Sequence, residues 1–139
     1  LLRPAPTYQG EETPEGVVHN YLLALEQEDY ERAYSYLSPS LEGYPNSADE
    51  FTDEVMDNRW QFELDETVSL AVESTRMIGE EARVTVREST SYDGSLFGGT
   101  DYSTTFDMRL QEESGEWKIT ASESYWSRCW DMDTTGPGC

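Results

Sequence analysis

The stretch GEWKITASESYW, residues 115–126, predicts the last strand of a β-sheet and poses a question about its inward face. Alternation of side chains places five residues on one side of this strand: Trp117, Ile119, Ala121, Glu123 and Tyr125. Trp117 and Ile119 favour burial, whereas an isolated buried carboxylate at Glu123 would be costly. We therefore expect the strand to leave the core near Ala121, so that Glu123 lies at the rim of a pocket rather than in its apolar centre.

Three earlier stretches alternate with the same period of two residues. They are TVSLAVES (67–74), EARVTVREST (81–90) and YSTTFDMRL (102–110). Short connections that contain Gly separate consecutive stretches. Because strands with short connections pair antiparallel, the sequence predicts a four-stranded antiparallel meander.

The first sixty residues follow the helical period instead. In TPEGVVHNYLLALEQED (13–29), Thr13 suits the N-cap and Pro14 the first helical position. Capping residues also precede two further helical stretches: Asp29 before YERAYSYLS (30–38), and Ser47 with Glu50 in SADEFTDEVMDNRW (47–60). The predicted fold class is α+β, with three N-terminal helices packed on a curved four-stranded antiparallel sheet.

The charge of the chain limits its partners. Twenty-nine acidic and nine basic residues among 139 give a net charge of -20. Such a surface repels nucleic acid and anionic lipid, so neither is an expected partner. Lys118 is the only lysine, and abundant acid with scarce lysine is typical of proteins from salt-adapted organisms. A simply acidic secreted protein explains the same composition, and the sequence leaves both interpretations open.

The ends of the chain indicate an extracytoplasmic protein. No apolar run approaches the length of a membrane helix. The chain does not start with Met, which is typical of a mature product, or of an artificially shortened chain, without its signal segment. A lipid anchor upstream of residue 1 is compatible with this start. Residues 1–12 suit an extended arm, 13–127 a single domain and 128–139 an irregular tail.

The two cysteines enclose the tail segment CWDMDTTGPGC. Cys129 and Cys139 are close enough in sequence to form a disulfide that closes the tail in an oxidising compartment. A zinc site would need more ligands, and the only histidine, His19, is distant and lies off the buried stripe of its helix. We therefore predict the disulfide and expect no metal and no cofactor.

Two segments resemble nuclear transport factor 2-like domains, a superfamily that shares a cystatin-like cone. TPEGVVHNYLLALEQEDYERAYSYLSPS (13–40) is similar to the opening helices, and LQEESGEWKI (110–119) to the closing hairpin. The resemblance covers residues 13–127 and is strongest to secreted or lipoprotein-borne members of bacteria and archaea, whose roles are mostly unassigned. It implies a cone-shaped α+β fold with a pocket in the mouth of the cone. Since the superfamily includes isomerases, dehydratases, epoxide hydrolases and cyclases, the fold alone implies no activity.

Two carboxylates are candidates for that pocket. Glu88 continues the inward register of Val84 and Val86, and Glu123 continues that of Ile119. On one concave face they would suit proton transfer, or binding of a cationic or hydroxylated ligand. A β-bulge near a strand end would instead move one of them to the other face.

Aromatic residues near the strand ends are the remaining candidates. Tyr102, Tyr125 and Trp126 suit a ligand-binding mouth or a protein interface, although most aromatics of the chain are expected in the core.

The favoured function is a non-catalytic extracytoplasmic module that binds a small ligand or a protein partner, or serves in an assembly. One alternative is a small-molecule isomerase, dehydratase or cyclase that uses Glu88 and Glu123 as acid and base. Another is a structural subunit of a surface assembly. Self-association is expected through the sheet or through the N-terminal arm, which would cover a sheet edge of its own or of a neighbouring copy.

The cysteines yield the first testable prediction. Alkylation of the intact native protein, followed by mass measurement, is expected to detect no free thiol. Reduction is expected to release the tail with little change in global stability, because the loop is short. Labelling of both cysteines without reduction would remove the argument for an oxidising compartment.

Overall fold

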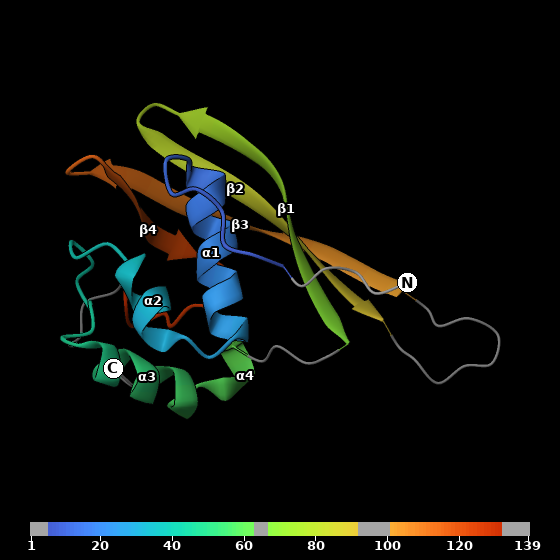
Figure 1. Cartoon of the computed structure of the whole chain (residues 1–139), viewed down its shortest axis with the longest axis horizontal. Helices are drawn as coiled ribbons and strands as arrows, with labels where there is room; N and C mark the ends of the chain where they lie inside the picture. Colours follow the sequence, from blue (N-terminus) through green and yellow to red (C-terminus); the bar gives the residue numbers. More distant parts are fainter. Residues whose placement is uncertain (1–5, 63–66, 92–100, 132–139) are drawn as a thin grey trace.

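The computed structural model describes residues 6–62, 67–91 and 101–131. In this part of the chain four helices precede four strands (Figure 1). The helices are α1 (Pro14–Glu26), α2 (Tyr30–Ser35), α3 (Ala48–Asp57) and α4 (Arg59–Phe62). The strands are β1 (Val68–Ile78), β2 (Glu81–Ser91), β3 (Asp101–Glu113) and β4 (Glu116–Ser122).

The strands form one antiparallel sheet in the order β1-β2-β3-β4, which confirms the predicted meander. Figure 1 shows the helices gathered over one part of the sheet, while β2 and β3 extend past them. The inward positions of β2 beneath the helices, Ala82, Val84 and Val86, are fully buried. The sheet therefore has one apolar face, and the helices cover part of it.

The prediction of three helices is inexact, because the third predicted segment divides into α3 and α4. Asn58 leaves the helical conformation at the end of α3, with φ of -120° and ψ of 40°. Its side chain donates to Glu54 O at 2.9 Å, and its own carbonyl accepts from Gln61 N at 2.9 Å. This local turn starts the short α4 in a new direction.

The N-caps of the other helices match the predictions. Thr13 accepts a hydrogen bond from Gly16 N at 3.1 Å, Asp29 from Arg32 N at 3.3 Å, and Ser47 from Glu50 N at 3.1 Å. Each bond satisfies a backbone N–H that has no partner within its helix.

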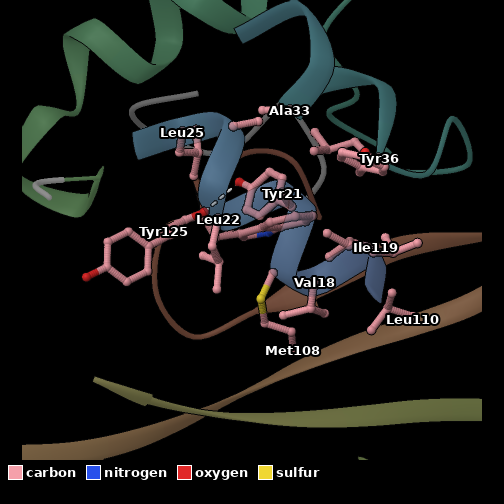
Figure 2. Packing of buried hydrophobic residues seen from close by; sticks show 14 of the residues in the cluster. Val18, Tyr21, Leu22, Leu25, Ala33, Tyr36, Met108, Leu110, Ile119 and Tyr125 are labelled. Carbon is pink, nitrogen blue, oxygen red and sulfur yellow. Dashed lines mark hydrogen bonds between the residues drawn. The ribbon is translucent and has the colours of Figure 1, made fainter. Parts of the chain in front are cut away.

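Helix α1 is the centre of the core. Its inward stripe of Val18, Tyr21 and Leu22 packs among buried residues of the sheet such as Met108 and Ile119 (Figure 2). The rest of the helix is also covered, since Val17, Asn20 and Leu23 are buried as well.

The N-terminal arm covers this second side of α1. Gln9 donates through its backbone N–H to Asn20 Oδ1 at 2.7 Å and accepts from Asn20 Nδ2 at 2.9 Å. His19 Nε2 lies 2.8 Å from Thr7 O, so the histidine is half-buried under the arm instead of facing solvent. The described part of the arm is thus held on α1, with Pro6 in a groove that Leu70 and Val72 of β1 also line. Cover of a sheet edge by the arm and self-association through it remain predictions.

One sheet edge is protected by a different segment. Ile119 of β4 donates to Tyr36 O at 2.8 Å and accepts from Ser38 N at 3.0 Å, so residues 36–38 continue the hydrogen bonding beyond β4. This pairing holds the middle of β4 between β3 and the turn after α2.

Strand β4 ends earlier than predicted, and a β-bulge changes its register. Ile119 pairs with Leu110 and Ala121 pairs with Arg109, so Thr120 is the extra residue that the strand pairing skips. The extra residue moves Ala121 to the outer face, where Arg109 lies. Trp117, expected in the core, is only half-buried, whereas Ile119 is fully buried.

The contrast between Ile119 and Trp117 is testable. Replacement of Ile119 by Ala is expected to lower the free energy of unfolding by about 2–5 kcal/mol, because it empties a fully buried site. Trp117→Ala serves as the matched control and is expected to cost less, although it removes a larger side chain. Urea denaturation measures both, and a larger loss for Trp117→Ala would contradict the observed burial.

Candidate ligand-binding site

The chain turns sharply where β4 ends. Ser122 Oγ donates to Ser124 O at 2.7 Å, and Tyr125 adopts a positive φ of 57°. Tyr125 N then donates to Gln61 O of α4 at 3.2 Å. These bonds carry the segment after β4 across the end of the sheet to α4, and bring residues that are far apart in sequence to one place.

Tyr125 and Glu88 meet at this turn. Glu88 keeps the inward register of β2, as predicted, and its Oε1 accepts a hydrogen bond from the Tyr125 hydroxyl at 2.9 Å. Burial, and then the neighbouring Glu88 carboxylate, raise the pKa of Tyr125, so the hydroxyl stays a donor. The Tyr125 ring also packs on Phe106, with centroids 5.6 Å apart.

Glu123 does not share the face of Glu88, because the bulge at Thr120 places it with the outer residues. Its Oε1 accepts a hydrogen bond from the backbone N–H of Asp107 on β3 at 2.7 Å, and the side chain is exposed. Glu123 thus lies at a rim, as the cost of burial required, and the bulge moves it off the inward register that it was expected to share with Glu88. A ligand site that uses both carboxylates remains a prediction.

An open pocket of about 420 Å³ occupies the space between the turn, α4 and β2. We name it the mouth pocket, and its lining comprises Trp60, Gln61, Glu88, Ser122, Glu123, Ser124, Tyr125, Trp126, Arg128 and Asp131. Four of the five predicted ligand-binding residues are among them. The fifth, Tyr102, is 61 % exposed on β3 and does not line the mouth pocket.

Two buried polar atoms of the mouth pocket lack hydrogen-bond partners among the described residues. They are Oε1 of Gln61 and Nε1 of Trp126, whose residue is only 5 % exposed. A buried polar atom without a partner is costly, so such atoms beside a pocket indicate groups that a ligand or ordered water satisfies.

Asp131 adds a third carboxylate to the lining. The residue is exposed as a whole, but its carboxyl group is partly buried, and this burial raises the pKa of Asp131. Its own backbone N–H, the Trp126 side chain and the charge of Arg109 act in the opposite direction and lower the pKa. The Trp126 indole therefore lies near Asp131 without forming a hydrogen bond of ordinary geometry.

Sequence reasoning missed the contribution of α4. Trp60 is 74 % exposed at the pocket, which is unusual for a residue of its size. Its position off the buried stripe of Phe51 and Val55 was a signal that it faces outward. The position of α4 against the turn after β4 had no such signal, because it depends on a long-range contact.

The outer face of the sheet carries exposed ion pairs. Arg76 contacts Asp107 at 3.1 Å, and Arg87 contacts Glu73 at 2.5 Å. These pairs are exposed, so each contributes little to stability. The described residues contain no group of three or more His, Cys, Asp or Glu side chains that could hold a metal ion.

Cys129 lies in the described segment, but Cys139 is outside the described residues. The predicted disulfide between them therefore remains a prediction. No helix of the described chain is long and apolar enough to cross a membrane.

Solved structures with similar folds place the chain in a structural class. A putative ketosteroid isomerase from Shewanella frigidimarina matches with a TM-score of 0.54 and 19 % identity, over 81 % of this chain and 95 % of that one. RPA3114, a SEC-C motif containing protein from Rhodopseudomonas palustris, matches with a TM-score of 0.55 and 16 % identity, over 84 % of this chain and 81 % of that one. A variant of Rd1NTF2_05 matches with a TM-score of 0.50 and 12 % identity, over 76 % of this chain and 90 % of that one. The chain thus has a nuclear transport factor 2-like α+β fold.

The family is more specific than the fold. Residues 16–127 match the family of the C-terminal domain of the anti-sigma-I factor RsgI9. This match spans most of the chain, and the chain belongs to that family. Among curated proteins, none matches the sequence.

The bond between Tyr125 and Glu88 yields a prediction. Tyr125→Phe removes the hydroxyl but keeps the ring and the backbone, so it is expected to lower the free energy of unfolding by about 0.5–1.5 kcal/mol. Tyr102→Phe is the control and is expected to change stability little, because its side chain is exposed. Equal effects in urea denaturation would show that the Tyr125 hydroxyl contributes no net stability.

Proposed function

We propose that the domain is a binding module and that the mouth pocket holds a small polar ligand. The observation that carries this proposal is the pair of buried polar atoms without partners, Gln61 Oε1 and Trp126 Nε1, beside an open space. A ligand that donated to Gln61 Oε1 would supply a hydrogen bond that the described protein does not make, while Trp126 Nε1 lies near the Asp131 carboxylate.

The exposed Trp60 supports the same interpretation. A large aromatic side chain at the edge of a pocket offers a flat surface on which a ligand can stack. Because most of the Trp60 side chain is exposed, it contributes little to the core packing of the domain.

The family is consistent with a binding role. The family is that of the C-terminal domain of an anti-sigma-I factor, and an anti-sigma factor is a regulatory protein. We propose that the domain binds the ligand as part of such a regulatory protein. An extracytoplasmic location remains part of this proposal, supported by the cysteines and the acidic composition.

Catalysis by Glu88 and Glu123 has less support. An acid and base pair needs two groups directed at one substrate. Glu88 and Glu123 both line the mouth pocket, but Glu88 accepts from the Tyr125 hydroxyl on the inner face and Glu123 accepts from the Asp107 backbone N–H on the outer face. The likeness to a putative ketosteroid isomerase lies below 25 % identity and concerns the fold.

A fragment screen by heteronuclear NMR tests the binding function. The four tryptophan indole N–H signals are assigned from single Trp→Phe variants. Fragments that bind the mouth pocket are expected to shift the signals of Trp60 and Trp126. Trp117 and Trp130 are internal controls, since Trp117 lies in a different groove and Trp130 Nε1 already donates to Glu54 at 2.5 Å.

Variants locate the binding further. Trp60→Ala is expected to weaken each hit without a loss of fold, because the side chain is exposed, while Tyr102→Ala is expected to leave binding unchanged. A library whose hits shift only Trp117, or that yields no hits at all, would refute a ligand site in the mouth pocket.

A further inference from the structure

We propose that the ligand of the mouth pocket is an organic cation, a primary ammonium or guanidinium group on a planar or apolar body. This inference rests on the proposed binding function and specifies its ligand class. Three features of the described lining support it: acceptors to which no described residue donates, its charge, and its aromatic surface.

The lining offers hydrogen-bond acceptors to which no described residue donates. The Glu88 carboxylate accepts one hydrogen bond, at Oε1 from Tyr125, and its second oxygen receives none from the described residues. Gln61 Oε1 is likewise without a donor there, and Asp131 supplies a further carboxylate near the Trp126 indole. Ionised carboxylates only accept hydrogen bonds, so the ligand that satisfies this set must bring N–H or O–H donors.

The charge of the lining selects a cation among such donors. Glu88, Glu123 and Asp131 are opposed by the single guanidinium of Arg128, which is exposed. The whole chain carries a net charge of -20, which raises the local concentration of cations around it. Charge-assisted bonds from an ammonium or guanidinium to a carboxylate are also stronger than bonds from a neutral hydroxyl.

The aromatic surface suits the body of an organic cation. Trp60 is exposed at the pocket, and the rings of Tyr125 and Trp126 form its inner side. The faces of aromatic rings attract cations and stack on planar groups. The lining therefore combines the two elements that organic cations need, carboxylates for the charged group and rings for the body.

Three probes of nearly equal shape test the sign of the ligand charge: benzylamine, benzyl alcohol and benzoate. Each is titrated into the intact chain at constant ionic strength, and the indole signals of Trp60 and Trp126 report occupancy. Benzylamine, protonated at neutral pH, is expected to bind about tenfold more tightly than benzyl alcohol, with benzoate weaker than both. Added salt is expected to weaken the binding of benzylamine and to leave the binding of benzyl alcohol nearly unchanged.

Two carboxylate variants separate specific recognition from general attraction to an acidic protein. Glu88→Gln keeps an acceptor for the Tyr125 hydroxyl and is expected to remove most of the preference for benzylamine. Glu112→Gln removes the same charge from an exposed site on β3 outside the mouth pocket, and is expected to retain the preference. Trp60→Ala tests the contribution of the aromatic ring at an exposed site, where the fold is not at risk, and is expected to weaken the binding of benzylamine.

The outcomes distinguish this inference from the function on which it rests. If benzyl alcohol or benzoate shifts Trp60 and Trp126 at least as strongly as benzylamine, the cation inference fails and the mouth pocket remains a binding site. Equal loss of preference in Glu88→Gln and Glu112→Gln also overturns it, because the attraction would then be unspecific. A lack of any pocket ligand in the wider fragment screen refutes the binding function itself.

Discussion

The hydrogen bond from the Tyr21 hydroxyl to Tyr125 O connects the helical layer to the segment that builds the pocket (Figure 2). Tyr21 is fully buried, and burial raises its pKa well above the ordinary value, so the hydroxyl is a donor that needs an acceptor. The Tyr125 carbonyl meets that need at 2.6 Å. It holds Tyr125 in a left-handed conformation from which the side chain reaches Glu88. The need of the buried Tyr21 hydroxyl for an acceptor thereby sets the position of Tyr125 at the rim of the mouth pocket.

Aromatic packing fixes the rest of this segment. Trp126 and Trp130 meet edge to face with centroids 4.9 Å apart, and Trp130 stacks on Phe51 of α3 at 5.1 Å. Trp130 is fully buried and donates to Glu54, whose pKa burial raises. The core therefore continues beyond residue 127, where the sequence placed the end of the domain. Trp130, which the sequence placed in an irregular tail, closes the end of the helical layer beside the mouth pocket.

The mouth pocket is polar because the sheet extends past its helical cover. Under α1 the inward residues of β2 are apolar and fully buried, but the next inward residue, Glu88, lies at the boundary of that cover. There the short α4 and the turn after β4 provide only partial burial. A carboxylate tolerates this position since Tyr125 donates to it and solvent reaches the pocket. The boundary between covered and uncovered sheet is thus where binding groups accumulate.

Much of the fold followed from local patterns in the sequence. The caps at Thr13, Asp29 and Ser47 and the change of period from helix to strand depend on neighbouring residues, and they predicted the helices and the meander. Glu88 was also predictable, because an unbroken strand alternates with a fixed period. The resemblance to nuclear transport factor 2-like domains agreed with these patterns.

Tertiary contacts decided the features for which the local pattern had no information. The bulge at Thr120 moves Glu123 from the inner to the outer face of the sheet. The composition of the strand carries no sign of such a bulge. The arm lies on α1 because buried Asn20 needs partners that Gln9 supplies. Trp60 and Gln61 join Glu88 only through the path of the chain after β4. Alternation and capping act over a few residues, whereas each of these outcomes depends on groups brought together from distant parts of the chain.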